Sequence, residues 1–107
     1  MAVTLEETFA ALADPTRIDI VRRLSRGTAS VSELAAPHEM SLRAVLKHVQ
    51  VLEDAGLVRT VKSGRVRRCE LQPRRIAETA QWLEQLRQRW QGRLDRLEQY
   101  AKEKEPQ

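Results

Sequence analysis

Apolar side chains recur every three or four residues through the first half of the chain, which is the spacing of amphipathic helices. Capping and breaking residues divide this pattern into four helices. The first is predicted from Thr4 to Ala13, the second from Asp14-Pro15 to near Gly27, a very short third after Ser30, and the fourth from Ser41 to Ala55. The residues predicted to face inward are Leu5, Phe9, Leu12, Ile18, Val21, Leu24, Leu34, Ala35, Val45, Val49 and Leu52.

Beyond Gly56 the period changes to the alternation of β-strands. Two β-branched, arginine-rich runs, Leu57–Lys62 and Val66–Leu71, flank Ser63-Gly64-Arg65, which predicts a hairpin with a tight turn. If Lys62 pairs with Arg65, Val58 lies opposite Cys69, and Leu71 shares their inward face.

Pro73 opens a long last helix, predicted to reach about Lys104. Its apolar residues, in steps of three and four, are Ile76, Ala80, Leu83, Leu86, Trp90, Leu94, Leu97 and Ala101. This stripe is longer than one small core can cover, so we expect it to pack in a homodimer. The interface residues predicted are Leu5, Phe9, Leu83, Leu86, Trp90, Leu94 and Leu97.

The order of elements predicts a mainly α fold with a two-stranded β wing, a winged helix-turn-helix. A chain of 107 residues has room for one domain, with an ordered core over 4–100 and a dimerisation helix over 73–104.

Charge is concentrated in the middle of the chain. The formal net charge is only +4, yet the segment 41–75 holds many basic residues and few acidic ones. The basic residues are Arg43, Lys47, Arg59, Lys62, Arg65, Arg67, Arg68, Arg74 and Arg75, and the acidic ones are Glu53, Asp54 and Glu70. Such a stripe is expected of a phosphate-binding surface, although a solvated charged face would look the same.

The fourth predicted helix carries side chains suited to base edges on the side away from Val45, Val49 and Leu52. Arginine and lysine donate to guanine, glutamine reads adenine, and leucine packs on a thymine methyl. The residues predicted to contact DNA from this helix are Ser41, Leu42, Arg43, Leu46, Lys47, His48 and Gln50. Any exposed helix face offers a similar pattern, and His48 also fits a packing role at the edge of the core.

The hairpin adds Lys62, Ser63, Arg65 and Arg67, around a turn where the backbone can approach closely. This composition favours contact with phosphate or the minor groove, which positions a protein without specifying sequence. The alternative is an edge hairpin kept soluble by charge.

Other classes of protein find little support. The sequence has no nucleophile–base pair, glycine-rich phosphate loop or acidic dyad, so we expect no enzyme. The single cysteine, Cys69, excludes an internal disulfide framework and fits a small buried residue, with a thiol switch as the alternative. With no basic-then-apolar leader and no long apolar run, the expected location is the cytoplasm, away from membranes.

Ordered motifs over residues 5–100 resemble the ArsR family of arsenical-resistance-type winged helix repressors. The matching strings are ALADPTRIDIVRRL, SVSELA, MSLRAVLKHVQVLEDAGLV, SGRVRRCEL and WLEQLRQRW followed by RLDRLEQY. The resemblance implies a homodimer held by its first and last helices, a recognition helix over Ser41–Leu52 and a wing over Val58–Leu71. It further implies a repressor acting on a pseudo-palindromic operator of double-stranded DNA, with no effector identified.

Two positions depart from the family pattern on the predicted DNA face. Leu46 stands where the family often has serine, and Gln50 where a basic residue is common. The sequence also resembles the branch without metal-sensing cysteines, because 33–37 lacks cysteine and the last helix lacks histidine. We therefore predict no metal and no cofactor. The rival interpretation, a winged-helix protein-interaction module, is favoured by Leu42 and Leu46 and opposed by the arginines of the hairpin.

Overall fold

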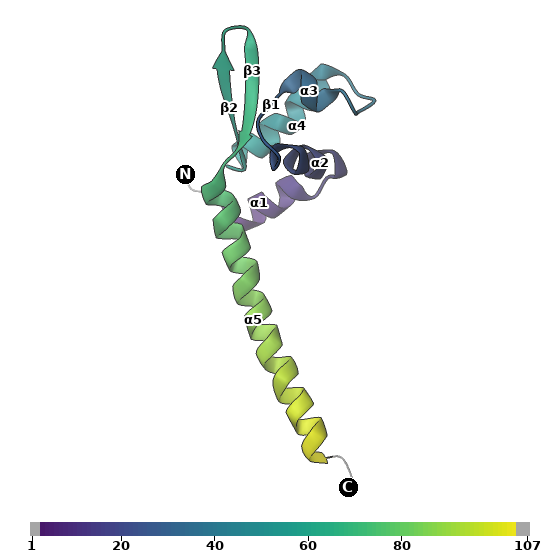
Figure 1. The fold of residues 1–107 in the computed structure, drawn as a ribbon, viewed down its shortest axis with the longest axis vertical. Helices are drawn as coiled ribbons and strands as arrows, with labels where there is room; N and C mark the ends of the chain where they lie inside the picture. The colour runs from purple at the N-terminus through teal and green to yellow at the C-terminus, as the bar shows by residue number, and fades with distance from the viewer. Residues whose placement is uncertain (1–2, 105–107) are drawn as a thin grey trace. The chain divides into compact units, whose positions relative to one another are not determined.

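The computed structural model describes residues 3–104; residues 1, 2 and 105–107 of the predicted domain lie outside the described part. The chain separates into two compact units, Met1–Ile76 and Ala77–Gln107. Its elements, labelled in Figure 1, are α1 (Leu5–Leu12), α2 (Pro15–Leu24), β1 (Ala29–Ser30), α3 (Val31–Ala35), α4 (Leu42–Asp54), β2 (Val58–Ser63), β3 (Val66–Leu71) and α5 (Pro73–Lys104). The mainly α fold with a β wing is confirmed.

Local capping chemistry explains where the helices of the first unit begin. In each case a short polar side chain accepts a hydrogen bond from a backbone N–H of the first turn, which would otherwise lack a partner. The capping side chains accept as follows: Thr4 from the N–H of Glu7, Asp14 from that of Arg17, Ser30 from that of Glu33 and Ser41 from that of Ala44. At α3 the Glu33 carboxylate accepts in return from the Ser30 N–H, which completes the predicted capping box.

The core lies where α2, α3 and α4 pack against the sheet, and it corrects part of the prediction. Leu24, Leu34, Val45, Val49 and Leu52 are buried as expected. In α2, however, Ile18 is exposed, and Ile20 is buried in its place. Two residues along a helix are rotated by about 200°. The spacing 20, 24 is as helical as 18, 21, 24, so periodicity alone could not choose between them.

A similar shift occurs in α1. Thr8 and Ala11 face the core, whereas the predicted Leu5, Phe9 and Leu12 are only half-buried. The hydroxyl of Thr8 donates to the carbonyl of Thr4, so its burial leaves no unsatisfied polar atom.

The sheet has three strands in the order β1-β3-β2, one more than predicted. The extra strand β1 is only two residues long, and Ala29 and Ser30 lie opposite Cys69 and Arg68 of β3. Two residues carry no periodic signal, so the sequence pattern could not show this strand.

The hairpin register also differs from the prediction. Ser63 pairs with Val66 and Lys62 with Arg67, rather than Lys62 with Arg65. Gly64 and Arg65 then form a two-residue turn, and Gly64 takes a positive φ of 64° at its first position, as in a type II′ turn. The register is displaced by two residues, so every side chain keeps its predicted face, and Val58 and Cys69 remain buried.

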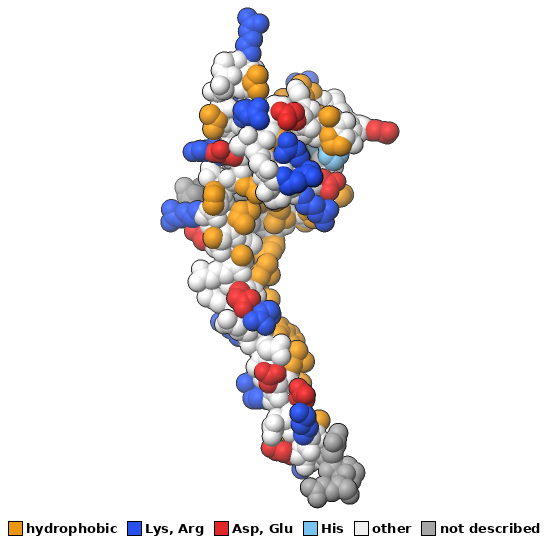
Figure 2. Space-filling model, viewed as in Figure 1, with side chains coloured by type: hydrophobic (Ala, Val, Ile, Leu, Met, Phe, Trp, Pro, Cys, Tyr) orange, Lys and Arg blue, Asp and Glu red, His pale blue; other side chains and the backbone are white. Residues whose placement is uncertain are grey.

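The second unit consists of the α5 residues beyond Ile76. Leu83, Trp90, Leu94 and Leu97 are exposed, and Leu86 is half-buried. Hydrophobic side chains follow one side of this helix in Figure 2. Within residues 3–104, no helix is both long enough and apolar enough to cross a membrane.

Candidate nucleic-acid interface

Helix α4 presents an exposed face opposite its buried one. Val45, Val49 and Leu52 point into the core. On the other side, Arg43 and Lys47 lie one turn apart in solvent, and Leu42 is 49% exposed at the first position of the helix. The Ser41 hydroxyl fixes the start of the helix by accepting from the Ala44 N–H at 3.1 Å. The result is a rigid helix with two free cations and one apolar contact at its exposed N-terminal half.

Two predicted members of this face are less available. Leu46 is half-buried and packs against the core, so only part of its side chain can reach a ligand. The Gln50 amide is exposed but donates to the Asp54 carboxylate at 2.8 Å, one turn along the same helix. To read a base, Gln50 must first exchange that surface hydrogen bond, which is a small cost for an exposed pair.

His48 lies on the side of α4 that faces α2 and forms part of a brace. Its Nδ1 is 3.2 Å from an Nη atom of Arg17 and 3.9 Å from the Asp14 carboxylate. Because a guanidinium can only donate, Nδ1 accepts, and the proton of neutral His48 is on Nε2. Arg17 also donates from Nε to the Ala11 carbonyl at 2.6 Å. The brace therefore joins the end of α1, the start of α2 and the middle of α4.

Asp14 shows how this brace is held electrostatically. The hydrogen bond from the Arg17 backbone N–H lowers the pKa of its carboxyl, assisted by the charge of the Arg17 guanidinium. Arg17 is a functional candidate that the sequence analysis missed. Its only signal was its place three residues after a capping aspartate, which predicted a helix start and nothing about α4.

The wing divides its basic residues into paired and unpaired ones. Arg59 pairs with Glu70 across the strands, and Arg68 contacts Thr28 at 3.3 Å and Glu33 at 3.7 Å. In contrast, Lys62 and Arg67 are Cα partners on neighbouring strands, on the face shared by Thr60 and Cys69. Like charges placed opposite each other destabilise a sheet, so this pair has no folding benefit.

In the part of the chain that the structure describes, five basic side chains of α4 and the wing have no hydrogen bond or ion pair. These unpaired cations are Arg43, Lys47, Lys62, Arg65 and Arg67. Basic side chains extend to the tip of the hairpin in Figure 2. A groove of about 310 Å³ separates α4 from the wing, with Leu42 and Leu46 on one side and Arg65 and Arg67 on the other. Ser63, also predicted to contact DNA, is exposed beside the turn.

Cys69 belongs to β3, on the inner face of the wing, and is fully buried. Burial raises the pKa of its thiol, and the nearby Glu53 carboxylate acts in the same direction. A protonated, inaccessible thiol reacts slowly. Within the described residues, no three His, Cys, Asp or Glu side chains form a group able to hold a metal ion.

Comparison with known proteins agrees with this geometry. Residues 12–61 match the model of a helix-turn-helix domain family. A solved ArsR family transcriptional regulator is 46% identical, covers 81% of this chain and 96% of its own, and superposes with a TM-score of 0.76. The chain belongs to the ArsR family.

Two curated proteins extend the likeness. An HTH-type transcriptional regulator of Mycobacterium tuberculosis is 40% identical over 72 residues, which are 67% of each chain. A transcriptional repressor SmtB homolog of Synechocystis is 36% identical over 64 residues, which are 60% of this chain and 48% of that one. This ArsR-family chain is accordingly a transcriptional regulator with a DNA-binding fold, and not an enzyme.

Proposed function

We propose that this regulator is a homodimeric repressor that binds a pseudo-palindromic operator in double-stranded DNA, in the cytoplasm. The observation that carries the proposal is the sorting of the basic residues. Within α4 and the hairpin, Arg59 and Arg68 are paired with carboxylates, whereas Arg43, Lys47, Lys62, Arg65 and Arg67 have no such partner and lie on α4 and the outer half of the wing. Five cations without protein partners on one helix and one hairpin suit a polyanion, because DNA phosphates and guanine edges supply a partner for each.

The two elements have separate roles in this proposal. Arg43 and Lys47 read base edges in the major groove, with Leu42 placed for a thymine methyl and Gln50 for an adenine. Ser41 sets the start of the helix, and His48 offers its Nε2–H to a backbone phosphate. The wing residues Lys62, Ser63, Arg65 and Arg67 contact phosphates or the minor groove, which fixes position rather than sequence. Leu46 contributes mainly packing, since it is half-buried.

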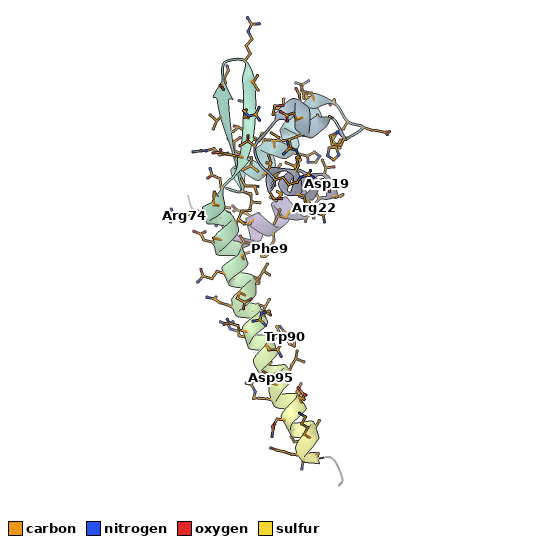
Figure 3. The ribbon with its side chains drawn as sticks, viewed as in Figure 1. Phe9, Asp19, Arg22, Arg74, Trp90 and Asp95 are labelled. Atoms are coloured by element: carbon orange, nitrogen blue, oxygen red, sulfur yellow. The ribbon has the colours of Figure 1, made fainter. Side chains whose placement is uncertain are left out.

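The dimer is proposed from the apolar stripe of α5. Trp90 stands out from the helix in Figure 3 and is 54% exposed, and Leu94 and Leu97 are more than half exposed one and two turns further on. Contiguous apolar surface of this kind is rare on a monomer in water. A two-fold axis would bury Leu83, Leu86, Trp90, Leu94 and Leu97 against their own copies, with Leu5 and Phe9 at the same interface.

Selection of bound duplexes from a random DNA pool tests the proposal. A two-fold dimer predicts enriched sites with two inverted half-sites, whose centres are separated by about 10 base pairs or a multiple of that. In transcription assays with a purified polymerase, such a site placed over a promoter should reduce transcript yield. Enrichment of a single half-site would contradict the dimer, increased transcript would contradict repression, and no enrichment would contradict sequence-specific binding.

A further inference from the structure

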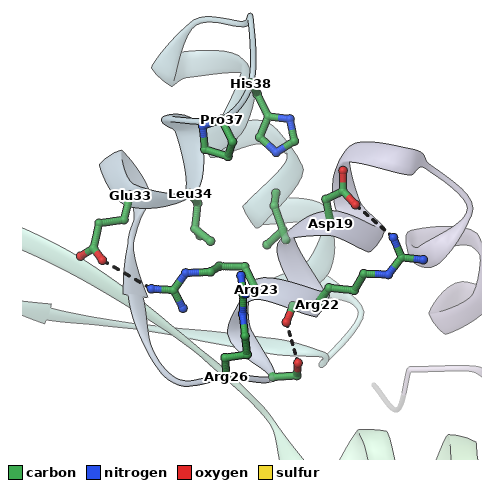
Figure 4. A pocket seen from close by; sticks show the side chains of 10 residues that line it. Asp19, Arg22, Arg23, Arg26, Glu33, Leu34, Pro37 and His38 are labelled. Carbon is green, nitrogen blue, oxygen red and sulfur yellow. Dashed lines mark hydrogen bonds and ion pairs between the residues drawn. The ribbon is translucent and has the colours of Figure 1, made fainter.

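A pocket of about 730 Å³ lies between α2 and α3, within the first unit (Figure 4). Three arginines line it, Arg22 and Arg23 in the last turn of α2 and Arg26 just after it. Leu34 and Pro37 form an apolar part of its wall. None of these side chains belongs to the proposed contacts with DNA.

The arginines of this pocket are weakly engaged. Arg22 lies 3.3 Å from Asp19, but the two side chains are 77% and 52% exposed, and exposed pairs of this kind contribute little. Arg23 lies 3.5 Å from Glu33, also at the surface, and donates a second hydrogen bond to the Gly27 carbonyl at 3.2 Å. Arg26 forms no side-chain hydrogen bond or ion pair with any residue between 3 and 104. The pocket thus holds one guanidinium without a partner and a second that can exchange its partner.

We propose that this pocket binds a small organic anion, whose carboxylate or phosphate group is held by Arg23 and Arg26 and whose apolar part lies against Leu34 and Pro37. A planar guanidinium matches the geometry of both anionic groups and can donate two parallel hydrogen bonds to either. The carboxylate of Glu33 already occupies part of this position, which shows that Arg23 can hold such a group there.

The same carboxylate connects the pocket to the wing. Glu33 lies between Arg23 of α2, at 3.5 Å, and Arg68 of β3, at 3.7 Å, and it accepts from the Ser30 N–H at the start of α3. An anion that binds Arg23 breaks the ion pair between Arg23 and Glu33. The Glu33 carboxylate then keeps only its contacts with Arg68 and Ser30. Because Arg68 is next to the unpaired Arg67, this exchange changes how the wing is held. The anion also lowers the net positive charge of the first unit, which carries the proposed DNA face. We therefore expect it to weaken DNA binding, by about fivefold or more if the coupling is of ordinary size.

The first experiment examines the pocket without DNA, so it does not depend on the proposed function. Amide NMR spectra of the ¹⁵N-labelled full chain are recorded with inorganic phosphate or citrate, and with sodium chloride at equal ionic strength. Saturable shifts at Arg26, Leu34 and His38 are expected with phosphate or citrate and not with chloride. In Arg23→Gln and Arg26→Gln the apparent affinity should fall at least tenfold, while Arg89→Gln on α5 should match the parent. Shifts that do not saturate, or that persist in both pocket variants, would overturn the proposal.

The second experiment examines regulation, and this part rests on the proposed function. Citrate at constant ionic strength should weaken binding to the selected duplex in the parent protein and not in Arg26→Gln. Saturable citrate binding with unchanged DNA affinity would refute the coupling and leave the pocket standing. If neither the parent nor the variants bind DNA while the pocket still binds citrate, the proposed function is refuted and the proposed anion site is not. If Arg23→Gln and Arg26→Gln weaken DNA binding without citrate and no anion saturates the pocket, its arginines contact DNA phosphates, and the effector site is refuted.

Discussion

The cross-strand pair Lys62 and Arg67 allows a test in which fold stability and DNA affinity change in opposite directions. The two residues are Cα partners on β2 and β3, both are exposed, and neither has a hydrogen bond or an ion pair with a described residue. Facing like charges cost a sheet roughly 0.2–1 kcal/mol, and solvent screening favours the lower end. Lys62→Gln removes the repulsion, so the free energy of unfolding should stay level or rise by a few tenths of a kcal/mol.

The same substitution should reduce the affinity for DNA. Each phosphate contact contributes about 0.9 to the slope of log affinity against log salt concentration. A dimer presents two wings, so losing one contact per wing should lower the slope by about 1.8. When the salt concentration rises from 50 to 200 mM, the DNA affinity of the variant should therefore fall by a factor about 12-fold smaller than that of the parent. Lys62→Gln is thus expected to leave the fold at least as stable and to make the DNA complex weaker and less dependent on salt.

Fluorescence anisotropy over a salt series gives the slope, and urea melts give the stability. Arg59→Gln is the matched control on the same hairpin, because its guanidinium is already paired with Glu70 and should not be available to phosphate. The control should leave the salt slope unchanged. An unchanged slope in Lys62→Gln would refute the role given to the wing, and a loss of more than about 1 kcal/mol in stability would refute the assignment of a repulsive pair.

Three further predictions concern assembly, the thiol and acid stability. Trp90→Glu should convert the dimer to a monomer, as measured by light scattering, because it places a charge in the apolar stripe. Gln85→Glu, on the other side of α5, should stay dimeric. A parent protein that is itself monomeric would contradict the role given to the stripe. Cys69→Ala should retain DNA binding, and stoichiometric zinc, cadmium, copper or arsenite should not release DNA; a tenfold shift in affinity, about 1.4 kcal/mol, would contradict a metal-independent regulator. Backbone N–H groups lower the pKa values of Asp14 and Glu33 in the folded chain, so their contribution to stability is present above about pH 4 and lost as the pH falls further. Urea midpoints below pH 4 should decline less in Asp14→Asn than in the parent, and an equal decline would contradict this account.

Much of the fold was predictable because its signals are local. Ser30 with Glu33, Ser41 and Asp14-Pro15 begin helices through contacts within one turn, and the structure has all of these caps. The faces of α4 followed from the helical period, since Val45, Val49 and Leu52 can only lie on one side. The resemblance to the ArsR family could be found from the sequence for the same reason, because the family's motifs lie at these helix starts and on the wing.

The wrong predictions concern features that the local sequence pattern leaves open. Whether Ile18 or Ile20 faces inward depends on what covers α2, and both choices fit a helical period. The hairpin register depends on whether the turn begins at Ser63 or Gly64, and a glycine with positive φ suits either turn position, so the sequence Ser63-Gly64-Arg65 fits both registers. The brace of Arg17 and His48 joins positions 31 residues apart, so no window of sequence could show it. The roles of the site residues remain predictions that require DNA.

The central claim is that α4 reads sequence while the wing supplies affinity, and binding to two duplexes separates these roles. Arg43→Ala and Lys47→Ala are compared with Arg65→Ala and Arg67→Ala on the selected operator and on a scrambled duplex, at several salt concentrations. The α4 variants should cost about 1–3 kcal/mol on the operator and little on the scrambled duplex, whereas the wing variants should weaken both alike. If the α4 variants weaken both duplexes equally while the wing variants abolish discrimination, the two roles are reversed and the claim is contradicted.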